Sequence, residues 1–226
     1  MKENREYKNE ALAALKSTWP QAVLAVLAYL GLAILFAVPT AFNEVMLLSD
    51  PTNLALESRG SVWSLTINIA EILVFCPLLV GLVNCFKIIL VDGDDRTVTN
   101  TFKVGFGNYW HNLWGVVLCK IFVVLWSLLL VIPGIIKSLS YAMTNYILVD
   151  RPDLSANEAI NLSKEMMYGH KFDLFYLYLS FAGWFILCIL TLGIGYLWLL
   201  PYVQTAQASF YLDVKADYER RTAVCA

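Results

Sequence analysis

The residues best suited to acid–base or metal chemistry are the two histidines of the chain, His111 and His170. Both stand at the start of apolar segments, and Asp173 follows His170 by three residues. A histidine pair with a nearby carboxylate can bind a metal or exchange protons near neutral pH. Placement at a membrane interface explains the same residues without chemistry, and the sequence contains no HExxH, GxSxG or phosphate-binding glycine loop. We therefore predict no catalytic residue, no metal site and no cofactor.

Charged residues inside apolar segments form a second group of candidates, because such residues are costly in a membrane and need a reason. Glu71 and Lys137 are both expected near the outer ends of their helices, where they could form an ion pair. A protonated, hydrogen-bonded Glu71 and a role of Glu71 in ion or proton coupling are the alternatives. Lys87 and Lys120 lie near cytoplasmic helix ends, so we expect their ammonium groups to extend to the interface.

Uncharged polar residues recur at helical spacing in three later segments. If these stripes face one another, they line a polar seam that opens toward the cytoplasm. The alternative is that they form interhelical hydrogen bonds, which most membrane bundles contain. The stripes comprise Tyr141, Thr144 and Asn145; Asp173, Tyr176, Ser180 and Gly183; and Gln204, Gln207 and Tyr211.

Long apolar runs must position all of these residues. The longest, from Leu174 to Leu212, is 39 residues without Asp, Glu, Lys, Arg or His, whereas about 20 residues cross a bilayer core of roughly 30 Å. Two glycines, Gly193 and Gly195, interrupt this run, so we expect two spans joined by a turn. Hydrophobic residues make up 59% of the chain and charged residues only 15%, which is typical of a polytopic membrane protein.

These runs predict an all-α, polytopic transmembrane helical bundle of about six spans in a single integral membrane domain, residues 1–226. The positive-inside rule sets its direction. With both termini cytoplasmic, the outer side keeps only Arg59 and Lys137 among the Lys and Arg residues, and Lys120 is within the membrane. The fourth segment is only about 22 Å long at 1.5 Å per residue, and this charge bias is the reason to count it as a span. We expect spans at 19–42, 62–91, 113–132, 135–149, 172–192 and 195–212, cytoplasmic tails at 1–18 and 213–226, and short cytoplasmic amphipathic linker helices at 97–109 and 155–168.

The tetrapeptide Ile-Leu-Val-Asp occurs twice, at residues 89–92 and 147–150. Each copy is followed by an Asp-rich turn, a short helix, a glycine and the next apolar segment. Since both copies would enter the membrane from outside, the pattern predicts a parallel internal repeat of span, linker helix and span. Chance similarity between apolar segments is the alternative.

The second linker helix has a defined start and one apolar face. Ser155 and Glu158 form a capping-box sequence, in which the two side chains satisfy free backbone N–H groups. Gly169 follows as the stop signal. The face could dock a partner, lie on the membrane surface or pack beneath the bundle. It comprises Ala156, Ala159, Ile160, Ser163, Met166 and Met167.

The second half of the chain carries a series of residues with a family likeness: Tyr146 to Pro152, Ser155, Glu158-Ala159, Ser163, Met166-Met167, Gly169, Lys171, Leu174-Phe175, Leu179 to Phe181, Gly183-Trp184, Thr191, Gly193 to Gly195 and Pro201-Tyr202. With this series the chain resembles the bacterial integral-membrane family called domain of unknown function 975. It is more distantly similar to the membrane portion fused to some glycerophosphodiester phosphodiesterases. The resemblance implies a bacterial inner-membrane location, but the uncharacterised family implies no activity and no functional residues.

Composition narrows the classes of function further. The net charge of −2 argues against a nucleic-acid partner, and the five cysteines, without CxxC spacing, are typical of small membrane-buried side chains. We therefore expect a non-enzymatic scaffold or accessory protein whose partners are the lipid bilayer, other membrane proteins or a second copy of the chain. A small-solute or lipid transporter is the alternative, and it requires a continuous polar cavity that a scaffold does not.

Overall fold

The computed structural model describes residues 2–49, 54–93 and 97–225, and all regular secondary structure within these ranges is α-helical. The predicted all-α class is thus confirmed for the described residues. Their helices are α1 (Asn4–Leu15), α2 (Trp19–Ser49), α3 (Leu54–Asp92), α4 (Thr97–Gly107), α5 (Tyr109–Leu129), α6 (Val131–Tyr141), α7 (Thr144–Asp150), α8 (Ala156–Met166), α9 (Lys171–Leu179), α10 (Ala182–Leu190) and α11 (Tyr196–Cys225).

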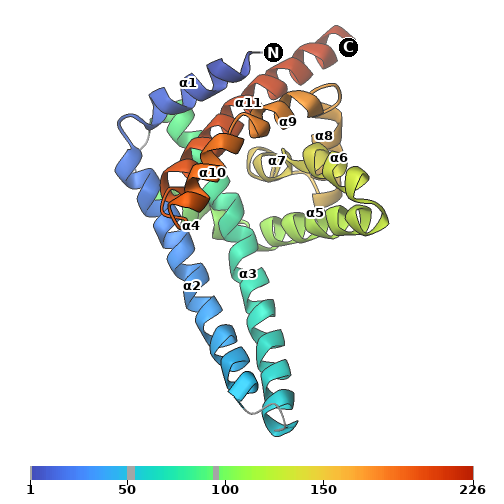
Figure 1. The fold of residues 1–226 in the computed structure, drawn as a ribbon. Coiled ribbons are helices and arrows are strands. Elements are labelled where there is room, and N and C mark those ends of the chain that lie inside the picture. The colour runs from blue at the N-terminus through green and yellow to red at the C-terminus, as the bar shows by residue number, and fades with distance from the viewer. Residues whose placement is uncertain (1, 50–53, 94–96, 226) are drawn as a thin grey trace.

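Several helices have the length and composition of membrane spans. Helices α2 and α3 form a long hairpin that projects away from the other helices (Figure 1). The hairpin exposes apolar side chains such as Leu35, Val38, Leu65 and Ile69, which is the surface expected of helices in lipid. Within the described residues, four segments qualify as candidate spans: Trp19–Phe42, Val62–Asp92, Tyr109–Leu128 and Lys171–Leu190.

The N-terminal segment predicted as a tail is a docked helix, α1. It lies along α11, so that the two ends of the chain are close together (Figure 1). Tyr7, Ala11 and Leu15, spaced at four residues, are fully buried. This spacing places the three side chains on one face of α1, and burial of that face holds the helix on the body of the protein.

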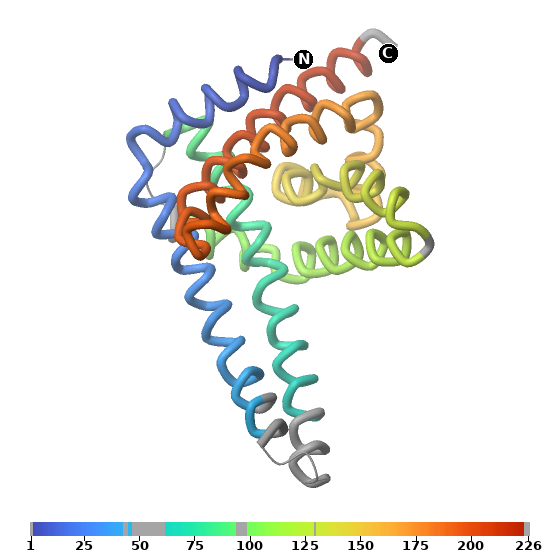
Figure 2. Tube along the Cα trace, viewed as in Figure 1, coloured from blue at the N-terminus to red at the C-terminus, as the bar shows by residue number. Residues whose placement is uncertain are grey.

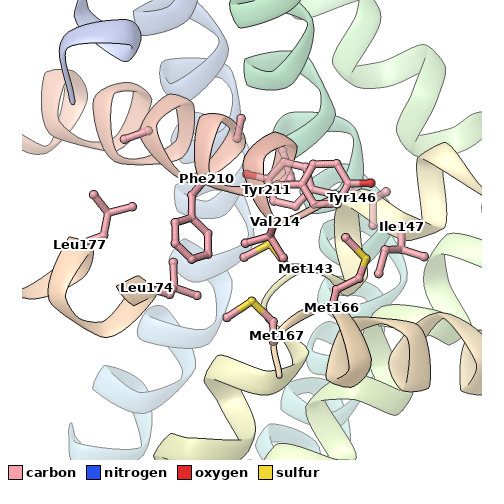
Figure 3. Close-up of a cluster of buried hydrophobic side chains, with 14 of the residues drawn as sticks. Met143, Tyr146, Ile147, Met166, Met167, Leu174, Leu177, Phe210, Tyr211 and Val214 are labelled. Atoms are coloured by element: carbon pink, nitrogen blue, oxygen red, sulfur yellow. The ribbon is translucent and has the colours of Figure 1, made fainter. Parts of the chain in front are cut away.

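The central core is apolar and gathers side chains from the segment around α7 and from α8, α9 and α11 (Figure 3). The rings of Tyr146 and Tyr211 stack in it with centroids 4.7 Å apart. Burial of an apolar side chain of this size stabilises a fold by about 1.5–3 kcal/mol, so this cluster is a main source of stability. Its members include Met143, Ile147, Met166, Met167, Leu174, Leu177, Phe210 and Val214, each at most 2% exposed.

Helix α8 has the start and the buried face that the sequence predicts. The Ser155 amide donates to Glu158 Oε2 at 2.7 Å, and the Glu158 amide donates to Ser155 Oγ at 3.4 Å. Ala159 and Ile160 are buried, and the buried Ser163 hydroxyl donates to the Ser140 carbonyl at 2.9 Å. Because this face packs inside the protein, it is not a docking surface for a partner.

Helix α4, within the first predicted linker (97–109), packs closely on α3. A Cβ atom added to Gly105 would lie 2.6 Å from the Pro77 carbonyl oxygen, and one added to Gly81 would overlap the Thr101 carbonyl oxygen. Glycine at these positions lets the two backbones approach. Gly81 precedes the end of α3 by eleven residues, which is about 16 Å at 1.5 Å per residue. Helix α4 therefore lies beside the apolar part of α3 and not at the end of α3 that was predicted to be cytoplasmic.

The fourth and sixth predicted spans have a different structure from the one expected. Residues 135–149 are divided between α6 and α7, with a break at Ala142 and Met143. The predicted span 195–212 falls, from residue 196 on, in α11, which continues through most of the predicted tail, 213–226, as far as Cys225. Neither the fourth nor the sixth predicted span is among the candidate spans of the described residues. Helix α5, which contains most of the third predicted span, crosses α3 at a steep angle instead of running beside it (Figure 2).

The turn between α10 and α11 has the predicted glycine but an unexpected position. Gly193 has a φ of +87°, and its amide donates to a carbonyl of α10 at 2.8 Å, which ends that helix. Thr191 and Gly195, at this turn, line the same groove as Leu12 and Trp19. In the six-span topology a bilayer core of roughly 30 Å would separate the turn from Trp19. Six spans are therefore not confirmed.

The two Ile-Leu-Val-Asp copies occupy different surroundings. Asp92 is exposed at the end of α3, whereas the Asp150 side chain is only 12% exposed and forms ion pairs. The turn after the first copy includes residues 94–96, which lie outside the described residues. The side chains of Arg59 and Cys225 also lie outside the described part of the structure. The predicted parallel repeat is not confirmed by this arrangement.

Candidate functional site

Asp150, the last residue of α7, is a mostly buried carboxylate with partners on two other helices. It forms an ion pair with Lys87 of α3 and accepts hydrogen bonds at 2.8 Å from Lys215 Nζ and from the Tyr211 hydroxyl, both on α11. Three helices distant in sequence therefore meet at one carboxylate. Lys87, which was expected to extend to the interface, instead has a buried counterion.

Helical spacing explains how this cluster forms. Tyr211 and Lys215 are four residues apart on α11, so both side chains lie on one face of that helix. Tyr146 and Asp150 are likewise four residues apart on α7 and share a face. The stacking of Tyr146 on Tyr211 then brings the Tyr211 hydroxyl and the Lys215 ammonium to the carboxylate.

The electrostatics of the cluster indicate a structural role. Burial alone raises the pKa of Asp150, but hydrogen bonds from Lys215 and Lys87 outweigh burial and hold that pKa below its ordinary value. The carboxylate is therefore ionised at neutral pH, and its oxygens are occupied by three donors. A carboxylate in this state is poorly suited to act as a general base or nucleophile, and it joins α3, α7 and α11.

A second polar cluster ties α1 to α11. The Tyr7 hydroxyl donates to Asp213 Oδ2 at 2.6 Å, and the Lys2 amide donates to the same oxygen at 2.9 Å. Lys2 Nζ also pairs with Glu10 at 2.6 Å, and the Ser209 hydroxyl donates to Glu10. These contacts fix the N-terminal helix in place, and they involve residues that the sequence did not single out.

His170 is held between two carboxylates at the start of α9. Its Nδ1 lies 3.4 Å from Asp173 Oδ2 and its Nε2 lies 3.1 Å from Asp217 Oδ2. Asp217 also pairs with Arg221 at 3.0 Å. His111 lies on α5, and its buried Nε2 has no hydrogen-bond partner among the described residues. Within those residues, no three His, Cys, Asp or Glu side chains are grouped as metal ligands.

The predicted ion pair between Glu71 and Lys137 does not form. Both side chains are described, and no ion pair joins them; Lys137 Nζ instead lies 4.5 Å from the centre of the Trp126 ring. Trp126 is on α5 and Lys137 on α6, so this cation–π contact closes the α5–α6 hairpin. Glu71 is half-buried on α3.

The three polar stripes do not line one seam. Helix α9 buries Leu174 and Leu177, whereas Tyr176 is 57% exposed and Ser180, which follows the last residue of α9, is exposed. The stripe predicted to face inward therefore faces outward.

The other seam residues are dispersed. Tyr141 is buried, and Lys164 Nζ lies 5.6 Å from its ring centre. Asn145 and Gln207 are half-buried. Gln204 Oε1 is buried without a hydrogen-bond partner among the described residues. None of these side chains lines the groove beside Leu12 and Trp19.

Comparison with known sequences gives one match. Residues 128–218 match the model of a family described as "Protein of unknown function (DUF975)". Neither a curated protein nor a solved structure matches the chain, and the expected similarity to glycerophosphodiester phosphodiesterase fusions is not shown. The matched segment contains α6 to α10, most of α11 and the Asp150 carboxylate with its α11 partners. Over residues 128–218, therefore, the chain is similar to the DUF975 family of proteins of unknown function.

Proposed function

We propose that this protein is a non-enzymatic scaffold or accessory protein of the bacterial inner membrane. The observation that carries the proposal is the orientation of α9. Its Leu174 and Leu177 fill the interior at the place where a transport seam would need Tyr176 and Ser180. The interior is thus closed by apolar packing, which suits a rigid protein that holds others and not a conduit for a solute.

The bonding of the two reactive-looking clusters supports a non-enzymatic role. The Asp150 oxygens accept from Lys87, Lys215 and Tyr211. The two ring nitrogens of His170 both face carboxylate oxygens. A general base must lie within reach of a substrate proton, whereas both of these groups are already bound by partners within the protein.

The pairing of the chain ends supports a topology in which both termini are cytoplasmic. The Lys2 amide donates to Asp213, so the N-terminal and C-terminal helices lie on the same side of any membrane that the protein crosses. An even number of crossings satisfies this condition, and the excess of Lys and Arg near both ends makes that side the cytoplasm. The partners are then the lipid bilayer and other membrane proteins or a second copy of the chain, and the net charge of −2 disfavours nucleic acid.

Thiol labelling in inverted and right-side-out membrane vesicles tests the closed interior. The native cysteines are replaced, and single cysteines are placed at Asn145, Gln204 and Gln207, with exposed Glu219 as the labelling control. The proposal predicts that a membrane-impermeant maleimide labels Glu219→Cys from the cytoplasmic side only and labels the three interior positions from neither side. Labelling of Gln204→Cys and Gln207→Cys at a rate near that of Glu219→Cys would reveal a water-filled path and would favour a transporter.

A further inference from the structure

A groove of about 410 Å³ lies between the N-terminal helices and the α10–α11 turn. It is lined mainly by apolar and aromatic side chains, among them Leu12, Trp19, Trp184, Leu187, Trp198 and Tyr202. Ligand-binding pockets are typically about 300–1,000 Å³ and mostly apolar. The groove is thus large enough to hold part of a hydrophobic ligand.

The surroundings of the groove indicate that it opens to lipid. Trp19 begins one candidate span, and Trp184 and Leu187 belong to another. Neighbouring side chains on the same helices, Leu24 and Ile186, are apolar and at least 56% exposed. An apolar opening between such surfaces meets acyl chains and not water, and tryptophan is enriched where acyl chains meet headgroups.

Two lysines stand beside the apolar groove. Lys8 and Leu12 of α1 and Lys16, its C-cap residue, are spaced at four residues, and the helical backbone continues to Lys16, so the lysines flank a lining residue on the same face. Lys16 is exposed, and no ion pair engages its ammonium in the part of the chain that the structure describes. The groove therefore combines an apolar interior with a cationic rim.

Lys8 is fixed close to the groove. Its Nζ donates to the Ser180 carbonyl at 2.8 Å and lies 4.5 Å from the centre of the Phe181 ring. That ring packs at 5.0 Å against Tyr202, which lines the groove. Burial lowers the pKa of Lys8, and a neighbouring phosphate would favour its charged form. The Glu10 carboxylate of α1 is paired with Lys2 and Ser209.

We propose that this groove binds an anionic phospholipid of the cytoplasmic leaflet, with one acyl chain against Trp184 and Leu187 and the headgroup phosphate at Lys8 and Lys16. The two lysines favour an anionic headgroup by charge complementarity, and the apolar lining of the groove favours an acyl chain. Lipid binding in this groove goes beyond a scaffold function, because a scaffold with a closed interior could exist with or without a lipid in a groove on its surface.

Native mass spectrometry of the purified full chain tests the proposal, with titration of palmitoyl-oleoyl phosphatidylglycerol against palmitoyl-oleoyl phosphatidylcholine. The wild type should bind one phosphatidylglycerol in preference to phosphatidylcholine. Since a lysine near an anionic lipid contributes about five-fold in affinity, Lys8→Gln with Lys16→Gln should lose at least that factor of the preference. The charge-matched control, Lys103→Gln with Lys164→Gln on α4 and α8, should keep it.

Filling the groove tests the acyl-chain contact independently. Leu187→Trp should weaken binding of both lipids at least five-fold, whereas Ile186→Trp, on the adjacent exposed position of α10, should leave binding unchanged. Both positions are more than half exposed, so both variants should fold, and equal melting temperatures would show it. Absence of a phosphatidylglycerol preference in the wild type, retention of that preference without Lys8 and Lys16, or displacement of lipid by a second copy of the chain would each overturn the proposal.

Discussion

Replacement of Asp150 by asparagine should destabilise the protein strongly. The substitution keeps the shape of the side chain but removes the charge that faces Lys87 and Lys215, so two ammonium groups lose their shared counterion. Removal of one partner from a buried ion pair costs about 3–5 kcal/mol. The lower end of that range applies, because the Lys215 side chain is 37% exposed and water replaces part of its interaction.

A loss of about 3 kcal/mol corresponds to a fall in melting temperature of roughly 6–12 °C for a chain of this length. Circular dichroism of the detergent-solubilised full chain at pH 7 measures it. Asp153→Asn is the matched control: its pair with Arg151 has side chains that are 60% and 54% exposed, and surface pairs of this kind contribute little. The reasoning is refuted if Asp150→Asn melts within 2 °C of the wild type.

The same carboxylate predicts a pH dependence. Burial raises the pKa of Asp150, but Lys215 and Lys87 lower it further, so the net value in the folded state is below the ordinary value of about 3.9 for an unfolded chain. The stabilisation is therefore complete above that ordinary value and is lost as pH falls through the lower folded value. The difference in melting temperature between wild type and Asp150→Asn should shrink below pH 4, and a constant difference would contradict the assignment.

Three further substitutions probe the packing of other helices. Gly81→Ala should cost about 1–3 kcal/mol, because its Cβ would overlap the backbone of α4, whereas Gly183→Ala, with nothing within 4 Å of a Cβ, should be neutral in the same melting assay. Ser155→Ala should cost about 1 kcal/mol through loss of the α8 cap, and an unchanged melting temperature would show that the cap adds nothing. Tyr7→Phe should cost about 1.5–3 kcal/mol, because its hydroxyl donates to the ionised Asp213; a protease-resistant α1 in this variant would argue against the loss.

Features encoded within a few residues could be predicted from the sequence. The capping box of Ser155 and Glu158 is present, and the face that includes Ile160 and Met166 is buried. The glycine turn at Gly193 ends α10 as expected. Each of these features depends on local spacing and backbone preference, which neighbouring residues fix by themselves.

Features that depend on distant neighbours could not be predicted. Asp150 meets Lys87 and Lys215 across 63 and 65 residues of sequence, whereas the position of Lys87 near a helix end predicted only that its ammonium group extends to the interface. On α9, the Leu174 stripe and the Tyr176 stripe both have helical spacing, and the adjoining core decides which one is buried.

The number of spans was open for a related reason. The positive-inside charge bias counted residues 135–149 as one span although the segment is short, but the chain breaks between α6 and α7 at Ala142 and Met143, without a glycine or proline at that point. No local signal marks such a break, because it depends on how α7 packs to bring Asp150 to its partners.

The central claim is a closed body in which the α10–α11 turn lies beside the start of α2, and an electron-spin distance measurement tests it most directly. Spin labels at exposed Ser17 and Leu192, in a chain without native cysteines and reconstituted in lipid nanodiscs, report the separation between these two points. The arrangement described here predicts a distance well below the roughly 30 Å thickness of a bilayer core, because Trp19 and Thr191 line one groove. A distance at or above that thickness would place the turn on the opposite side of the membrane and would contradict both the closed body and the lipid groove.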